Sequence, residues 1–316
     1  MKTKIIFLLA AIFAISFNAR ANSSETAYPE NPKIDAVTLV QRAFKQISVN
    51  YPKSDNQMNA FYKERVTKNS SCISVNEAIL DINKTSYITP KSDQVAVRDA
   101  RGNTNIKECD HYMIKLQGGP LTSLQLDVIK HPFLGSDIYN IGENYNFSYG
   151  KPTEFAGKKF YVVNFNQKYA NGEMLFRGKM YIESESLAIG KIEYSMNVEN
   201  REWAYARFLK RKPKQTDVKI LSADYVVNYR EYNNKWYFDY STSNVELNIL
   251  NKLESTFDVY TINSQLAVTN LVAEGFTINK KEMLKSTDIL ADKINDYKIA
   301  SEWDIYNLIM LLAANY

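Results

Sequence analysis

The sequence has few of the residues that build enzyme active sites and metal centres. It holds two histidines and two cysteines in 316 residues. None stands in a spaced pair such as Cys-x-x-Cys or His-Glu-x-x-His, the patterns that bind zinc. Gly-x-Ser-x-Gly and a phosphate-binding glycine-rich loop are also absent from it. We therefore predict no metal, no cofactor and no catalytic residue, with a hydrolase as a minor alternative.

A hydrolase with a nucleophilic side chain would need one of the two histidines. His111 lies in the run 108–111 (Glu-Cys-Asp-His), where consecutive side chains point in different directions and do not converge on one ion. His131 precedes Pro132 at the expected end of a helix, where the helix dipole favours an imidazolium. Structural roles are favoured for both, and a hydrolase would require His111 beside an acid in a cleft.

No apolar run reaches the roughly 20 residues of a membrane-spanning helix. The longest, residues 5–17, follows Lys2 and Lys4 and precedes the small-x-small residues 19–21. This pattern is typical of a secretory signal peptide, residues 1–21. Asn22 follows it instead of a lipid-attachment cysteine. We therefore expect an exported protein, periplasmic or associated with the outer envelope, with no lipid anchor and no transmembrane segment.

The two cysteines, Cys72 and Cys109, both lie in the exported part of the chain, where disulfides persist. One bridge between them would contribute about 3–4 kcal/mol in the chain-entropy model. The alternative is two reduced, buried thiols, since spacing alone does not show that the Cβ atoms face each other. A Cys72–Cys109 disulfide is therefore one of two open predictions.

The net charge of the mature chain is low, because basic and acidic residues are nearly equal in number. The formal net charge is +4, and residues 1–21 carry three basic residues and no acid, which leaves +1. That charge does not favour nucleic acid or anionic membranes as partners. A basic run remains at residues 210–214, and we interpret it as a solvated loop between strands.

The mature chain is long enough for one large β-rich domain, because removing 21 of 316 residues leaves 295. Residues 22–33, rich in Asn, Ser, Glu and Pro, predict a flexible leader. Residues 34–316 predict a single α+β domain. Within it, apolar spacing of three and four residues indicates a first helix that Asp35 caps and that ends before Pro52. Further helices are predicted at residues 121–130 and 280–295, with a break at residues 286–288 (Ser-Thr-Asp) as the alternative for the second of these.

The remaining pattern is one of strands joined by short turns. Alternating β-branched and aromatic residues predict strands at residues 60–66, 72–82, 161–165, 174–182, 189–196, 218–231, 236–247 and 254–269. Asn233-Asn234 predicts a hairpin turn, because asparagine tolerates positive φ. A twisted antiparallel sheet of this size tends to curl. We therefore predict an α+β fold: a curved antiparallel half-barrel with a few helices covering its concave face.

Aromatic residues are abundant, with 22 tyrosines and 15 phenylalanines. They either fill the core of the sheet or line an apolar cavity that holds an acyl chain or a partner's side chains. The candidate ligand-binding residues are Phe176, Tyr181, Trp236 and Phe238.

Several segments resemble a module of exported proteins of Gram-negative bacteria, which usually follows a carboxypeptidase-regulatory-like β-sandwich. They include residues 50–52 (NYP), 58–64 (MNAFYKE), 76–82 (NEAILDI), 176–189 and 303–307 (WDIYN). The sandwich itself is missing from this sequence. The resemblance implies no activity and no site residues, because none is established for the family.

Residues 178–192 are also similar to hairpins of the lipoprotein-carrier half-barrels of the bacterial periplasm. That resemblance implies a curved sheet with helices in its concavity, holding acyl chains. Our leading hypothesis is a non-enzymatic envelope protein that binds a hydrophobic ligand, an acyl chain or lipoprotein-like, in the concavity. The alternative is a protein–protein interaction or structural module of the envelope with no small ligand, for which the apolar segment 303–316 would supply a contact surface. The sequence does not indicate an oligomeric state.

Overall fold

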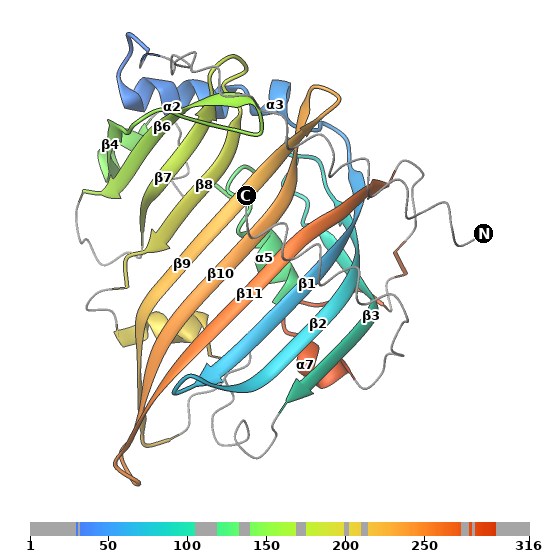
Figure 1. Cartoon of the computed structure of the whole chain (residues 1–316), viewed down its shortest axis with the longest axis vertical. Coiled ribbons are helices and arrows are strands. Elements are labelled where there is room, and N and C mark those ends of the chain that lie inside the picture. Colours follow the sequence, from blue (N-terminus) through green and yellow to red (C-terminus); the bar gives the residue numbers. More distant parts are fainter. Residues whose placement is uncertain are drawn as a thin grey trace, which may run out of the picture.

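The computed structural model describes residues 30, 32–104, 119–132, 140–168, 175–198, 202–209, 214–272, 278–279 and 282–294. These residues form one curved antiparallel sheet with short helices on one of its faces (Figure 1). The α+β class and the half-barrel architecture expected from the sequence are confirmed. Residues 1–21, Cys109, His111 and residues 303–316 lie outside the described part of the chain, so the predictions made for them stay predictions.

The sheet is a meander of 11 strands whose first strand pairs with its last. In chain order the strands are β1 (Asn56–Lys68), β2 (Ser71–Lys84), β3 (Gln94–Thr104), β4 (Tyr145–Tyr149), β5 (Thr153–Phe155), β6 (Lys158–Gln167), β7 (Phe176–Glu183), β8 (Ile189–Met196), β9 (Thr216–Tyr232), β10 (Lys235–Asn251) and β11 (Thr256–Val272). Their order in space is β3-β2-β1-β11-β10-β9-β8-β7-β6-β4, with β5 beside β6.

Short helices lie on one face of this sheet. They are α2 (Ala36–Lys45), α3 (Ile47–Asn50), α5 (Gly119–Gln125), α6 (Ile141–Asn144), the 3₁₀ helix η2 (Glu202–Arg207) and α7 (Leu290–Lys293). In Figure 1, α5 lies behind the central strands and α7 behind β2 and β3, so both are on the side away from the viewer. We call this side the inner face.

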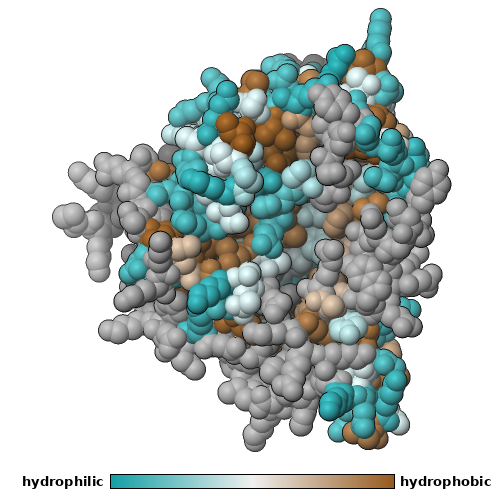
Figure 2. Space-filling model, turned by 180° about the vertical axis from the view of Figure 1, so that it is seen from behind, coloured by the Kyte–Doolittle hydropathy of each residue, from teal (hydrophilic) through white to brown (hydrophobic). Residues whose placement is uncertain are grey.

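The two faces of the sheet differ in composition because successive side chains of a strand point to opposite sides. On β8 the inner face carries Tyr194 and Met196, which are buried, whereas the outer face carries the half-buried Lys191 and Glu193. The apolar residues of the inner face, together with those of the helices, form the main hydrophobic core. Figure 2 shows the inner face, where apolar patches lie between polar side chains.

The first helix begins as the sequence predicted. Asp35 is its N-cap, and Asp35 Oδ1 accepts a hydrogen bond of 2.7 Å from the backbone nitrogen of Thr38. The second predicted helix is shorter than expected, because α5 ends at Gln125 and turns follow it up to residue 131. The third, at residues 280–295, is wrong over most of its described length: a β-bridge at Met283 and a turn precede α7. Asp288 accepts a 2.9 Å bond from the Lys285 backbone nitrogen there, which favours the turn over the helix.

The predicted strands are all present, most of them longer than predicted. Asn233 and Asn234 both have positive φ, 50° and 59°, so the predicted hairpin turn is confirmed. The sequence analysis missed β3, β4 and β5. In β3 the pairing with β2 shifts register between Ile79 and Leu80, and such a bulge breaks the alternation by which strands are recognised.

Candidate ligand-binding site

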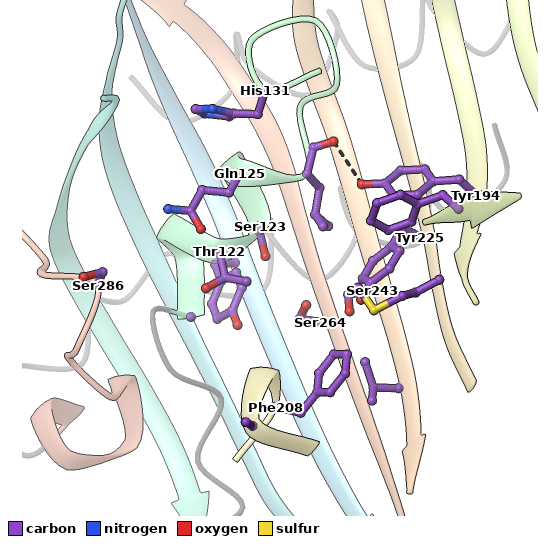
Figure 3. A pocket seen from close by; sticks show the side chains of 17 residues that line it. Thr122, Ser123, Gln125, His131, Tyr194, Phe208, Tyr225, Ser243, Ser264 and Ser286 are labelled. Atoms are coloured by element: carbon purple, nitrogen blue, oxygen red, sulfur yellow. Dashed lines mark hydrogen bonds between the residues drawn. The ribbon is translucent and has the colours of Figure 1, made fainter. Parts of the chain in front are cut away.

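A segment that includes α5 and the turns after it crosses the inner face of the sheet, held by hydrogen bonds from the strands beneath. Ser241 Oγ on β10 donates to the Ser123 carbonyl at 3.1 Å. Tyr194 OH on β8 donates to the Leu126 carbonyl at 3.1 Å, the bond dashed in Figure 3. We call residues 119–132 the crossing segment. Because the bonded carbonyls belong to its backbone, the segment is fixed at a defined height above the sheet.

Gly119 opens the crossing segment with φ +36°, a left-handed conformation that side chains other than glycine rarely adopt. A Cβ here would lie 3.7 Å from Tyr62 OH and 3.9 Å from Glu64 Oε2. The backbone therefore passes close over the polar side chains of β1, and the positive φ, more than lack of space, calls for glycine at this position.

A cavity of about 490 Å³ lies between the crossing segment and the sheet. That volume falls within the range of about 300–1,000 Å³ that is typical of small-molecule sites. Its lining residues are Tyr62, Gly119, Thr122, Ser123, Gln125, Leu126, His131, Phe176, Tyr194, Met196, Ala206, Phe208, Tyr225, Ser243, Val245, Ser264 and Ser286. They come from six strands, the crossing segment and the chain around η2 and before α7.

One side of the cavity is aromatic. The ring centroids of Phe176 and Tyr194 are 5.5 Å apart at an interplanar angle of 77°, and those of Tyr194 and Tyr225 are 5.0 Å apart at 33°. These rings form a row across β7, β8 and β9, and Met196 and Phe208 add further apolar surface. Burial raises the pKa of Tyr194 well above 10, so its hydroxyl stays neutral and the row carries no charge.

The other side of the cavity is polar but uncharged. Thr122, Ser123, Ser264 and Tyr62 supply hydroxyl groups, and Gln125 supplies an amide. Figure 3 shows Thr122 and Ser123 across the cavity from Tyr194 and Tyr225. Asp, Glu, Lys and Arg do not occur among the described lining residues. The cavity therefore suits a ligand with a large apolar part and an uncharged hydrogen-bonding group.

A buried carboxyl lies behind the polar side. Glu64 Oε2 accepts a 2.9 Å bond from Tyr62 OH, and Glu64 Oε1 accepts a 2.8 Å bond from Asn76 Nδ2. Burial raises the pKa of Glu64 above its usual 4.5, although both hydrogen bonds act in the opposite direction. The Tyr62 hydroxyl thus connects the cavity wall to an acid that resists ionisation.

Replacing Glu64 by glutamine should flatten the dependence of stability on pH. A folded-state pKa above 4.5 means that the folded protein binds the proton more tightly than the unfolded chain, so the free energy of unfolding falls as pH rises above 4.5. Glu64→Gln removes this slope. Urea unfolding of the wild type and the variant between pH 4.5 and 8 measures it.

Glu77→Gln is the matched control. Hydrogen bonds from Lys63 and Arg101 outweigh burial and lower the pKa of Glu77. Its contribution to stability is therefore present above pH 4.5 and is lost as pH falls through the lowered value. Equal slopes for the wild type and Glu64→Gln would contradict the assignment of a raised pKa to Glu64.

Beyond Leu126, the crossing segment is held by a buried ion cluster. Lys84 Nζ lies 2.7 Å from Asp127 Oδ2 and 2.6 Å from Asp93 Oδ2, and the side chains of Lys84 and Asp127 are 0% exposed. Tyr229 OH donates to Asp127 Oδ1 at 2.7 Å. Burial alone would lower the pKa of Lys84 and raise that of Asp127. Their mutual attraction, helped by Asp93 and Tyr229, reverses both shifts.

His131 lies at the edge of the cavity, and its backbone nitrogen donates to the Asp127 carbonyl at 2.8 Å. Burial and the nearby Lys84 lower the pKa of its imidazole below 6.5, so the neutral form is favoured at pH 7. This differs from the charged imidazole at a helix end that the sequence suggested, because α5 ends six residues before His131.

The structure separates the four candidate ligand-binding residues. Phe176 lines the cavity. Tyr181, five residues along the same strand, lies on the outer face, where its hydroxyl donates to Glu193 at 3.0 Å. Trp236 and Phe238 are on the inner face but buried, at 4% and 1% exposure, and neither lines the cavity.

Most cavity residues were missed by the sequence analysis. The hydroxyl side comes from single serines and threonines on separate elements, such as Ser243 on β10 and Ser264 on β11. These two serines could have indicated the cavity, because they interrupt the largely apolar inner face of β10 and β11.

Cys72 is exposed near the start of β2, and its Sγ lies 3.8 Å from the Ser74 carbonyl oxygen. The alternative of two buried thiols is therefore wrong for Cys72, because the end of the strand that carries it is open to solvent. Cys109 is outside the described residues, so a bridge between the two stays a prediction. Among the residues that the structure describes, no cluster of three or more His, Cys, Asp or Glu side chains is placed to hold a metal ion.

No family model and no curated protein matches the sequence. Similar solved structures include a LolA-superfamily protein from Nitrosomonas europaea, with 10% identity, a TM-score of 0.28, and coverage of 78% of this chain and 98% of that one. A DUF1329-family protein from Desulfovibrio piger has 9% identity, a TM-score of 0.28, and coverage of 77% and 96%. The Pseudomonas aeruginosa MucA/MucB complex gives 10% identity, a TM-score of 0.23, and coverage of 72% and 93%. At such low sequence identities and TM-scores, these similarities do not support a conclusion about function.

A second hollow, of about 610 Å³, lies over the outer face of β6 to β10 and is more open to solvent. Its lining includes charged side chains such as Arg177, Lys179, Glu193 and Asp224. Ser195 Oγ and Asp224 Oδ1 already bond to each other across it at 2.5 Å. Its width and its charges make it less suited to an apolar ligand than the inner cavity.

Within the described parts of the chain, no helix is long and apolar enough to cross a membrane.

Proposed function

We propose that this is a non-enzymatic exported protein of the cell envelope that binds a hydrophobic ligand in the cavity between the crossing segment and the sheet. One observation carries the proposal: an uncharged cavity of about 490 Å³ with an aromatic row on one side and hydroxyl groups on the other. Pockets of this kind bind ligands through apolar burial, and a few polar groups fix the orientation.

The cavity chemistry favours an acyl chain over a charged ligand. An ionised group inside would lose its hydration without meeting an opposite charge, because His131 is the one ionisable base among the described lining residues and is favoured neutral. An ester or hydroxyl group can bond to Ser123, Ser264 or Thr122. The ligand class proposed is thus an acyl chain, with any charged headgroup outside.

The same lining supports a binding role over a catalytic one. Nucleophilic catalysis by a serine needs an adjacent base that a third group orients. The described lining residues include serines and His131, and none of them is a carboxylate that could orient the imidazole.

Binding of a fluorescent fatty-acid probe to delipidated protein tests the proposal, and we expect micromolar affinity for the wild type. Ser243→Phe places a ring in the cavity and should weaken binding at least tenfold, about 1.4 kcal/mol. Phe176→Ala removes one ring of the aromatic row and should weaken binding severalfold.

Tyr181→Ala is the matched control, since it removes an aromatic side chain from the same strand on the opposite face. It should leave probe affinity unchanged. No uptake of the probe at any accessible concentration, or equal affinity for the wild type and Ser243→Phe, would overturn the proposal.

A further inference from the structure

The turn between β10 and β11 concentrates exposed apolar side chains. Seven large apolar residues are exposed in the described part of the chain, and three of them lie within the eight residues 250–257. Leu250 is 39% exposed, Leu253 75% and Phe257 59%. We call residues 250–257 the hairpin tip. Scattered single exposures need no explanation, but a cluster of this kind marks an interaction surface.

The hairpin tip projects beyond the rest of the sheet. The pairing of β1 with β11 ends at Tyr260, and the pairing of β8 with β9 ends at Asp224. Only β9 accompanies the hairpin to its end, where Thr216 pairs with Asn251. The hairpin extends from the lower end of the sheet in Figure 1, and in Figure 2 it is the projection at the lower right, with apolar side chains at its end.

Strand pairing and turn hydrogen bonds hold the residues of the tip together. Leu250 and Phe257 are directly opposite each other on β10 and β11. The turn between them is closed by bonds from the Leu253 and Glu254 backbone nitrogens to Asn251 Oδ1, at 3.0 and 3.4 Å. The three apolar residues therefore form one surface at the end of a three-stranded ribbon.

The exposed charged residues near this surface include more lysines than acids. Lys219 lies on the same face of the ribbon as Leu250, since both alternate with inward-facing residues. Lys214 precedes β9, and it is the last residue of the basic run 210–214, whose other members are outside the described residues. Lys252, in the turn itself, pairs with Asp217 at 2.8 Å, both more than half exposed. Lys214, Lys219 and Lys252 outnumber the two exposed acids near the tip, Asp217 and Glu254. Apolar residues with an excess of lysines around them complement a surface that is apolar inside and anionic outside.

We propose that the hairpin tip docks on an anionic phospholipid surface, with Leu250, Leu253 and Phe257 entering the headgroup boundary and Lys214 and Lys219 binding lipid phosphates. Docking of this kind would bring the protein to a membrane independently of what its cavity binds. The proposal does not rest on the proposed function.

Co-sedimentation with vesicles tests it, using phosphatidylcholine alone or mixed with phosphatidylglycerol. The wild type should bind the mixed vesicles, and added salt should weaken binding. Leu253→Ser with Phe257→Ser should weaken it about 100-fold, because each buried side chain is worth roughly a factor of ten or more. Lys214→Glu with Lys219→Glu should weaken it at least about fivefold per lysine, since each basic residue near an anionic surface contributes about that factor.

Ile88→Ser with Tyr232→Ser is the matched control, because both residues are exposed, at 52% and 56%, away from the tip. It should bind vesicles like the wild type. Fatty-acid probe binding should be unchanged in all tip variants, which separates this proposal from the cavity. Equal vesicle binding by the wild type and the Leu253/Phe257 variant, equal binding to both lipid mixtures, or no vesicle binding would overturn it; the last would point to a protein partner.

Discussion

Lys84→Met should destabilise the protein by about 3–5 kcal/mol, because it leaves two buried carboxylates without their cation. Asp127 is 0% exposed and Asp93 is 4% exposed in their side chains, so water does not replace the lost partner. Methionine matches the length of the lysine stem, so the substitution removes the charge, with its contacts to the Tyr87 and Phe238 rings, and leaves little void. Urea unfolding at pH 7 measures the loss.

Two further variants separate charge from packing. Removing all three charges with Lys84→Met, Asp93→Asn and Asp127→Asn should recover most of the stability, since buried ion pairs exchanged for neutral groups are often near neutral. Lys252→Met breaks the exposed pair with Asp217 and should cost less than about 1 kcal/mol. A loss for Lys84→Met as small as that for Lys252→Met would contradict a buried cluster.

The cluster also makes the stability of the fold depend on pH at low and at high pH. The lowered pKa of Asp127 gives stability that is present above 3.8 and is lost as pH falls through the lowered value. The raised pKa of Lys84 gives stability that is present below 10.5 and is lost as pH rises through the raised value. Both contributions are therefore complete across the neutral range.

Phe238→Ala should destabilise the protein by about 3–5 kcal/mol through the void that it leaves. Phe238 is 1% exposed. Its ring packs 6.5 Å from that of Tyr229, at an interplanar angle of 84°, and 5.5 Å from Lys84 Nζ. The same substitution tests whether Phe238 belongs to the core or contacts the ligand. If Phe238 is a core residue, its loss lowers the free energy of unfolding, whereas the protein that remains folded keeps most of its affinity for the fatty-acid probe.

Tyr237→Ala is the neighbouring control, because Tyr237 points to the outer face and is half-buried. It should cost much less than Phe238→Ala in the same urea experiment. A stable Phe238→Ala variant with abolished probe binding would place Phe238 in the ligand site and would contradict the core assignment.

The sequence predicted the meander because its strands keep a period of two for long stretches. The same period would have separated Phe176 from Tyr181, which are an odd number of residues apart and so face opposite sides of β7. It correctly placed Trp236 and Phe238 on the inner face. The period does not show how deeply an inner-face side chain is buried, because the crossing segment and the residues packed below it determine that.

The cavity and the ion cluster were beyond sequence reasoning for a different reason. Lys84, Asp93 and Asp127 are typical surface residues by type, and only the fold brings Asp127 of the crossing segment to within 2.7 Å of Lys84 on β2. The basic run 210–214 was interpreted as a solvated loop between strands. The exposed apolar tip near Lys214 becomes visible only once β9, β10 and β11 are aligned.

The pairing of the first strand with the last governs how this chain reaches its native state. Gln57 pairs with Val272 and Lys68 with Tyr260, so the contacts that close the sheet join residues far apart in the chain. Such high contact order slows folding, and until β11 arrives β1 exposes an unpaired edge that is prone to aggregation. We therefore expect this chain to aggregate less if it is kept unfolded until its synthesis has ended and β11 can pair with β1.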